Sequence, residues 1–161
     1  MHKQLFIVRH GSAPGANNGI SDFDRTLDDY GIRDNINISE QLILQYDPPN
    51  RIISSAAVRA LHSAMIYARA FNYPISEISI RDEIYSADKN IMLNIIKQTD
   101  NKIQNLLVCG HNPTFTELAN HYLKEKIHNM PTSGVVCLKF NSESWYKIGR
   151  SNVISYGFYH P

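Results

Sequence analysis

The sequence has no long hydrophobic run. Its first apolar stretch, Leu5 to Val8, is followed at once by a charged residue, Arg9. A bilayer-spanning helix needs about 20 apolar residues, and the apolar core of a secretory signal needs about 7 to 15. The pattern argues against a secreted or membrane protein. We therefore expect a cytoplasmic protein with no membrane partner.

Charge and cysteine are also scarce. Charged residues make up 19% of the chain and the formal net charge is +1, so no global basic field is available for nucleic acid. Cys109 and Cys137 both lie in apolar segments, which favours buried, reduced thiols over a disulfide. The seven histidines show no H-E-x-x-H spacing, and no glycine-rich nucleotide loop is present. We expect no metal, no cofactor and no nucleic-acid partner.

The 161 residues fit a single domain spanning 1–161, and nothing in the composition marks a linker or a repeat. We expect a monomer. Short apolar runs alternate with segments of helical periodicity, which predicts a three-layer α/β/α sandwich with a largely parallel central sheet. The strand order is not predictable. Strands are expected at 5–8, 51–53, 78–80, 106–109, 134–140 and 145–156, the last two joined by a turn at 141–144.

Capping residues predict where the four helices begin. The expected N-caps are Asp28, Ser54 or Ser55, and Asp88, and Pro113 fits the first position of the fourth helix. The residues expected to face the core are, in chain order, Ile32, Ile36 and Ile43; Leu61, Met65 and Ala68; Ile91, Met92, Ile95 and Ile96; and Phe115, Leu118, Ala119 and Tyr122. A polar loop at 11–26 is long enough to be functional, although a disordered excursion is the alternative.

Ionisable residues follow the predicted strands at their carboxyl ends. Arg9 and His10 end the first strand, and His111 ends the strand at 106–109. Arg59 lies about one helical turn beyond the strand at 51–53. Because ligands of open α/β sheets bind beyond the carboxyl ends of the strands, we expect these four side chains to meet in one crevice.

Two arginines and two histidines in one crevice suit the chemistry of an oxyanion. Guanidinium groups offer charged forks of donors to a phosphate, although a carboxylate would satisfy Arg9 and Arg59 equally well. A neutral His10 beside this clamp can attack phosphorus and form a phosphohistidine. The two arginines and a protonated His111 would then stabilise the charge of the transition state, and His111 needs its anionic ligand to favour that proton.

The chain resembles the histidine phosphatase superfamily, also called phosphoglycerate mutase-like, over nearly its whole length and in order. Its short length is similar to the SixA-type branch, the phosphohistidine phosphatases. The motifs that carry the resemblance are LFIVRHG at 5–11, SSAAVRA at 54–60, VCGHNP at 108–113, DFDRTL at 22–27 followed by Gly31, and MPTSG at 130–134. The chain departs from the family pattern at Ala56, Thr26 and Leu61-His62, none of which is a phosphate ligand.

The resemblance implies a role for each matching residue. His10 is the phosphate-accepting nucleophile, and Arg9, Arg59 and His111 complete the phosphate pocket. The motifs around the two histidines add Gly11 and Asn112 to the expected substrate-binding residues. Arg25 is expected at the pocket rim and Asp22 is expected to orient the cationic groups, with a plain loop ion pair as the alternative for both.

The resemblance leaves the general acid open. Larger relatives carry a glutamate after the third strand, and Glu83 is the best match, with a purely structural carboxylate as the alternative. Asp82 and Asp88 are its rivals. A phosphohistidine substrate reduces the need for an acid, because its imidazole leaving group can leave protonated. Phosphate monoesters with poor leaving groups should therefore react slowly.

The resulting hypothesis is a metal-independent phosphatase that hydrolyses phosphohistidine on a protein partner, such as a histidine phosphotransfer domain. The chain lacks the long insertions with which mutases and metabolite phosphatases cover their pockets, which favours a protein-borne phosphate. Two alternatives stay open: a small-molecule phosphomonoester phosphatase of the same superfamily, and a phosphate-binding module without turnover.

Overall fold

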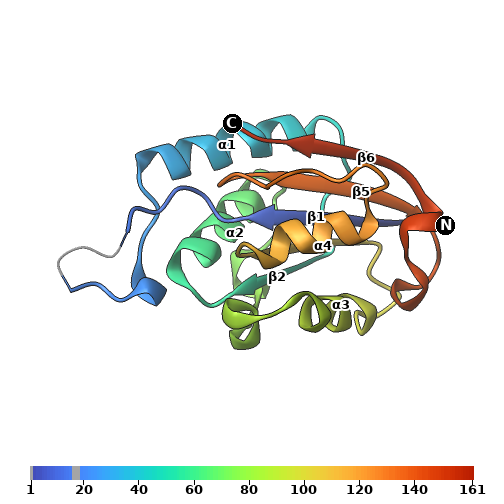
Figure 1. Ribbon diagram of the computed structural model, residues 1–161. Coiled ribbons are helices and arrows are strands. Elements are labelled where there is room, and N and C mark those ends of the chain that lie inside the picture. Colours follow the sequence, from blue (N-terminus) through green and yellow to red (C-terminus); the bar gives the residue numbers. More distant parts are fainter. Residues whose placement is uncertain (1, 16–18) are drawn as a thin grey trace.

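The computed structural model describes residues 2–15 and 19–161, and within them a six-stranded sheet forms the centre (Figure 1). The strand order is β3-β2-β4-β1-β5-β6. The strands are β1 (His2–Arg9), β2 (Arg51–Ser55), β3 (Ser79–Arg81), β4 (Asn105–Gly110), β5 (Val135–Asn141) and β6 (Val153–Tyr159). The helices are α1 (Asp29–Ile43), α2 (Val58–Ala70), α3 (Lys89–Lys97) and α4 (Thr114–Tyr122).

The sheet is parallel on one side and antiparallel on the other. Strands β3, β2, β4 and β1 run parallel to one another, whereas β5 pairs antiparallel with both β1 and β6. The predicted fold class, a three-layer α/β sandwich with a largely parallel sheet, is confirmed. The four expected parallel strands are present.

Two apolar clusters cover the two faces of the sheet. Alternate residues of β1 divide between them: Phe6 and Val8 pack with α1 and α2, whereas Leu5 and Ile7 pack with α3 and α4. This period-2 alternation is why the strand is apolar at every position. The unbroken apolar run therefore reports a strand buried on both sides.

The neighbouring strands β1 and β4 send the chain to opposite faces at their carboxyl ends. The segment after β1 leads to α1 on one face, and the segment after β4 leads to α4 on the other (Figure 1). Such a divergence opens a crevice between two adjacent parallel strands, where α/β proteins bind ligands. His10 and His111 stand at the two sides of this divergence.

Two predicted helix starts are confirmed and two are wrong. Asp28 and Asp88 cap α1 and α3, each accepting a backbone N–H three residues on. The second helix begins later than expected: Ala57 is the N-cap of α2 and has no side-chain cap, because the Ser55 hydroxyl turns to other partners. Pro113 is the N-cap of α4 and not its first helical residue, and its bond to Asn112 is cis.

The predicted core face of α1 is wrong. Ile36 and Ile43 are 41% and 42% exposed, while the helix buries Asn35, Ile38 and Leu42 against the sheet. The buried stripe includes a polar residue because the Asn35 amide donates to Ser63 on α2. The helical spacing of the isoleucines predicts that they face the core, but in the structure they line an open groove between α1 and α2.

The segment expected as a strand from Trp145 starts as a 3-10 turn. Trp145 is fully buried and its Nε1–H donates to the carbonyl of Ile103, so it is a core anchor outside the sheet. The last strand, β6, begins only at Val153. The sequence pattern of a large aromatic residue beside apolar neighbours is the same whether the residue belongs to a strand or is buried in the core outside the sheet.

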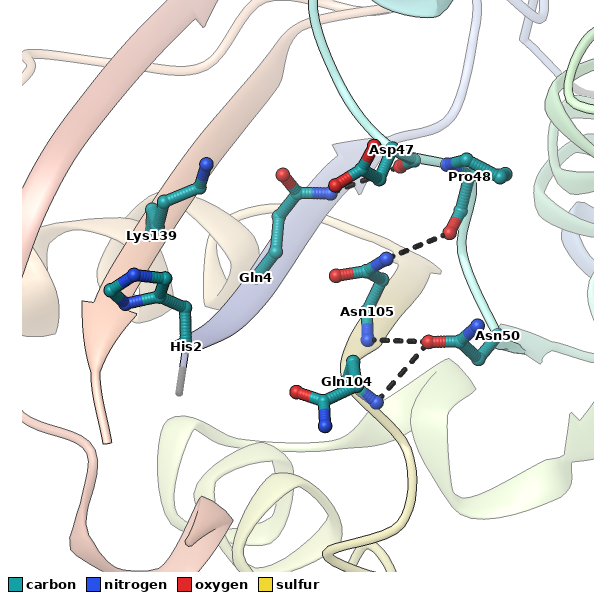
Figure 2. Close-up of a pocket in the computed structure, with 8 residues that line it drawn as sticks. All are labelled: His2, Gln4, Asp47, Pro48, Asn50, Gln104, Asn105 and Lys139. Carbon is teal, nitrogen blue, oxygen red and sulfur yellow. Dashed lines mark hydrogen bonds between the residues drawn. The ribbon is translucent and has the colours of Figure 1, made fainter. Parts of the chain in front are cut away.

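A cavity of about 470 Å³ lies at the amino ends of β1 and β4, opposite the crevice (Figure 2). Hydrogen bonds connect polar groups that line it to the loop before β2. The Gln4 amide donates to the carbonyl of Asp47, and Asn50 Oδ1 accepts the backbone N–H groups of Gln104 and Asn105. These bonds join three strand ends. The lining residues are His2, Gln4, Asp47, Pro48, Asn50, Gln104, Asn105 and Lys139.

Within the described residues, no helix is both long and apolar enough to span a membrane. Cys109 and Cys137 are buried free thiols, as predicted. Burial raises the pKa of both thiols, which keeps them protonated and unreactive at neutral pH.

Candidate active site

The His10 side chain is held in one tautomer. Its Nδ1 lies 2.7 Å from the carbonyl oxygen of Gly11, which can only accept a hydrogen bond. A neutral His10 therefore carries its hydrogen on Nδ1 and keeps a lone pair on Nε2. The ring is buried, with 7% of the residue exposed, and its backbone N–H donates to Gly110 on the neighbouring strand.

Arg59 lies against this lone pair. Its Nε–H donates to His10 Nε2 across 3.3 Å. The same guanidinium binds Asp22 twice, from Nη1 to the backbone carbonyl at 2.6 Å and from Nη2 to Oδ2 at 3.1 Å. At the base of the helix, Ser63 donates to the Arg59 carbonyl and accepts the Gly11 N–H, which ties α2 to the end of β1.

His111 faces His10 across the crevice, with 5.2 Å between the ring centroids. Its Nε2 lies 2.7 Å from the hydroxyl of Ser55, at the end of β2. Its Nδ1 is buried and has no hydrogen-bond partner. The ring of Tyr85 meets His111 edge to face at 5.5 Å and closes one side of the site.

Arg9 completes the cluster predicted from the strand ends. Its Nη1 donates to the carbonyl of Met130 at 2.8 Å, which fixes the side chain, while its Nε is buried without a partner. Buried donors are almost always satisfied in proteins. The unpaired Arg9 Nε–H can therefore donate to a bound ligand, and His111 Nδ1 can do the same when Nε2 accepts from Ser55.

The electrostatics keep both histidines neutral. Burial is the largest cause that lowers the pKa of His10, and together with the charges of Arg59, Arg9 and Arg25 it brings this pKa to about 4 against the opposing hydrogen bond to Gly11. Burial is also the main cause that lowers the pKa of His111 to about 3. A neutral His10 is the nucleophilic form, and an anion entering the site would raise both pKa values.

Asp22 joins three polar side chains at the edge of the site. It accepts from Arg59, from Arg25 Nε at 3.0 Å and from the Tyr85 hydroxyl at 2.5 Å. The Tyr85 hydrogen bond and the two arginines lower the pKa of Asp22 to about 2, so the carboxylate is ionised. Arg25 also donates to the carbonyls of Ala13 and Pro14. Asp22 thus orients Arg59 in this structure, and Arg25 anchors the loop.

Gly11 and Asn112 use their polar groups within the protein. The Gly11 N–H donates to Ser63, and a methyl group on Gly11 would come within 2.7 Å of the Asn35 amide nitrogen. Both amide hydrogens of Asn112 are bound, to Asn129 Oδ1 and the Met130 carbonyl, and its oxygen accepts from Thr116. That Gly11 and Asn112 contact the substrate stays a prediction. In this structure both residues form hydrogen bonds within the protein.

The candidate general acids form no hydrogen bond or ion pair with the cluster within the described residues. Glu83 is exposed and pairs with Arg81, whose hydrogen bonds lower the pKa of the carboxyl group. Within the described residues no contact joins Glu83 to His10, His111 or the two clamp arginines. Asp88 caps α3 and Asp82 is exposed. The structure thus brings together Arg9, His10, Arg59 and His111, whereas the Glu83 carboxylate is paired with Arg81.

Two serines that contact the cluster were missed as site residues. Ser55 was interpreted as a helix cap, and Ser63 was not singled out, yet Ser55 holds His111 and Ser63 holds the backbone of Arg59. Ser55 ends a strand, as His10 and His111 follow theirs, and this position in the sequence could have predicted that Ser55 lies at the site. Ser63 carries no signal in the sequence.

No protein-family model and no curated protein sequence matches the chain. Solved structures do. A protein of Agrobacterium tumefaciens assigned as the phosphohistidine phosphatase SixA superposes with a TM-score of 0.82 at 26% identity, over 99% of this chain and 98% of the other. This similarity supports the resemblance of the chain to the SixA-type branch of the histidine phosphatase superfamily.

Two further SixA structures agree on the fold. The SixA protein of Nakamurella multipartitia has a TM-score of 0.82 at 18% identity and covers 100% of this chain and 97% of the other. The protein histidine phosphatase SixA complexed with tungstate has a TM-score of 0.75 at 22% identity, over 97% and 94%. These two structures support the fold, and the Agrobacterium tumefaciens structure, at 26% identity, supports a phosphatase function of the histidine phosphatase type for this chain.

Proposed function

We propose that this SixA-type protein hydrolyses phosphohistidine on a partner protein through a covalent intermediate at His10. The supporting observation is the His10 ring, whose Nδ1 hydrogen is held by Gly11 and whose Nε2 lone pair lies beside the Arg59 guanidinium. Binding alone does not need a nucleophile with a fixed tautomer inside an arginine clamp.

The proposed reaction has two steps that balance in atoms and protons. Neutral His10 attacks the phosphorus of a substrate phosphohistidine whose ring is protonated on its other nitrogen. The bond between phosphorus and the substrate ring breaks, the substrate leaves as neutral imidazole, and the phosphoryl group moves to Nε2 of His10, whose ring then carries the positive charge. Water then attacks this phosphohistidine and releases dihydrogen phosphate, which returns His10 to its neutral form. Arg9, Arg59 and His111 stabilise the charge on the equatorial oxygens in both steps.

The leaving group reduces the need for a carboxylic acid that donates a proton in this site. An imidazole nitrogen leaves far more readily than an alkoxide, so little proton donation is required. The exposed Glu83, paired with Arg81, fits a reaction that does not depend on it. A phosphate monoester with an aliphatic leaving group should react slowly at the same site.

The test is phosphate release from a phosphohistidine-bearing phosphotransfer protein in the presence of a metal chelator. We compare the wild type with His10→Ala and with His128→Ala, which removes an exposed histidine outside the cluster. We expect release by the wild type and by His128→Ala, and none by His10→Ala. Brief incubation with labelled substrate should trap an acid-labile phosphoenzyme that His10→Ala cannot form.

Two outcomes would overturn the proposal. Equal release by His10→Ala and wild type would remove His10 as the nucleophile. Turnover of a sugar phosphate at a rate comparable to phosphohistidine would instead support a small-molecule phosphatase.

A further inference from the structure

Three buried side-chain atoms in the described part of the chain have no hydrogen-bond partner, and they belong to segments around His10. They are Arg9 Nε, His111 Nδ1 and Ser133 Oγ. Arg9 and His111 already belong to the candidate site. Ser133 has no role in the site so far, although it is fully buried and carries a hydroxyl group.

The backbone places Ser133 next to the main chain of His10. Its N–H donates to the carbonyl of His10 at 3.0 Å, and the carbonyl of Gly134 accepts the N–H of Arg9 at 2.9 Å. The segment just before β5 is therefore fastened to both residues at the end of β1. Ser133 is fixed relative to His10 by main-chain bonds and not by flexible side chains.

Ser133 adopts a backbone conformation that disfavours a side chain. Its φ is +62°, in a turn closed by the Gly134 N–H on the Pro131 carbonyl at 2.9 Å. Glycine adopts this left-handed region without strain, whereas a residue with a Cβ does not. Strained residues of this kind cluster at functional sites. A serine here carries the strain and also buries an unpaired hydroxyl, two unfavourable features at one residue.

A phosphoryl group on His10 would supply the missing acceptor. Its oxygens accept strong, charge-assisted hydrogen bonds, and a hydroxyl is a suitable donor. We propose that Ser133 Oγ is a phosphoryl ligand of this site, donating to an oxygen that Arg9 Nε and His111 Nδ1 also surround. The inference rests on the proposed function and adds one binding residue to it.

Tungstate, a phosphate analogue that does not turn over, tests the ligand directly. The variants are Ser133→Ala and Ser133→Gly, which both remove the hydroxyl but differ in backbone strain. Thr132→Ala is the matched control, because it removes a half-buried hydroxyl from the same turn. Affinity is measured by calorimetry, and the unfolding temperature is recorded for each variant.

We expect tungstate to bind about 10- to 100-fold more weakly to both Ser133 variants, the range for losing a hydrogen bond to a charged group, and within twofold of wild type for Thr132→Ala. Ser133→Gly should unfold at a higher temperature than Ser133→Ala, because glycine tolerates the positive φ. A fall in affinity together with this split in stability assigns the loss to the hydroxyl and not to the fold.

Wild-type affinity in the folded Ser133→Gly protein would overturn the inference and leave the proposed function intact. Tungstate binding by the wild type without phosphohistidine turnover would overturn the proposed function and leave Ser133 as an oxyanion ligand. A wild-type protein that binds no tungstate would overturn both. In a turnover assay, the Ser133 variants should also hydrolyse the trapped phosphoenzyme more slowly than Thr132→Ala.

Discussion

The Nε–H of Arg59 donates to Nε2 of His10 across 3.3 Å, so the clamp arginine lies on the lone pair that would attack phosphorus. The other two nitrogens of the guanidinium bind Asp22. Under the proposed function, an incoming phosphoryl group would take the place of His10 as the partner of Arg59 Nε. The Asp22 carboxylate would then compete with the phosphoryl oxygens for the same cation.

Asp22→Asn should strengthen oxyanion binding. The substitution removes a negative charge beside the phosphate position but keeps a side-chain oxygen that can accept from Arg59. We expect tungstate affinity to rise about threefold at low salt, and less at high salt because Asp22 is largely exposed to screening ions. Calorimetry at two salt concentrations measures it. Asp24→Asn, an exposed carboxylate of the same turn that bonds Ser21, is the control. Weaker binding by Asp22→Asn would contradict the competition.

The buried histidines should make stability fall with acid. The pKa of His10 is about 4 and that of His111 about 3 in the folded protein, against about 6.5 when unfolded. The unfolded state therefore binds more protons between pH 6.5 and 4, so stability is full above pH 6.5 and is lost below it. Each histidine accounts for about 2 kcal/mol between pH 6.5 and 5. Urea unfolding at both pH values should show this loss shrinking in His10→Gln.

The same linkage predicts a pH effect on anion binding. A bound oxyanion raises the pKa of His111, so binding takes up a proton, and tungstate affinity should increase as the pH falls from 7.5 to 6. Calorimetry in buffers of different ionisation enthalpy would measure the proton uptake. An affinity independent of pH would mean that His111 stays neutral in the complex.

Glu83→Gln should leave turnover of phosphohistidine within about threefold of wild type. Within the described residues the exposed carboxylate pairs with Arg81 and forms no hydrogen bond with the cluster, and an imidazole leaving group needs little proton donation. Steady-state rates at saturating substrate test this. A loss of 100-fold or more, with unchanged tungstate affinity, would restore Glu83 as the general acid.

Gly110→Ala should destabilise the fold by about 1–3 kcal/mol, the usual cost of overpacking. A methyl group there would come within 2.5 Å of the Phe115 ring and 3.1 Å of Ile84, and both neighbours are fixed in the core. Urea denaturation measures the change. Gly149→Ala is the matched control, since no atom lies within 4 Å of its added methyl group, and it should be near neutral. Equal stability of the two variants would show that the core next to His111 yields easily.

Local pattern was enough to predict the four parallel strands and the ionisable residues that follow three of them. A strand covered on both faces must be apolar at every position, so runs such as Leu106 to Cys109 are visible without any tertiary knowledge. The crevice followed because parallel strands bring their carboxyl ends to one edge. The caps Asp28 and Asp88 are equally local, since each bonds a backbone N–H three residues away.

Contacts between distant segments decided the rest. Ile36 faces outward because Asn35 finds Ser63 across 28 positions of sequence, and Trp145 leaves the sheet because Ile103 offers it an acceptor. The separation of Glu83 from the cluster and the approach of Ser133 to His10 are of the same kind. The sequence shows which polar groups are present. A hydrogen bond between residues far apart in the sequence depends on how the helices pack on the sheet, and this packing is determined only by the complete core.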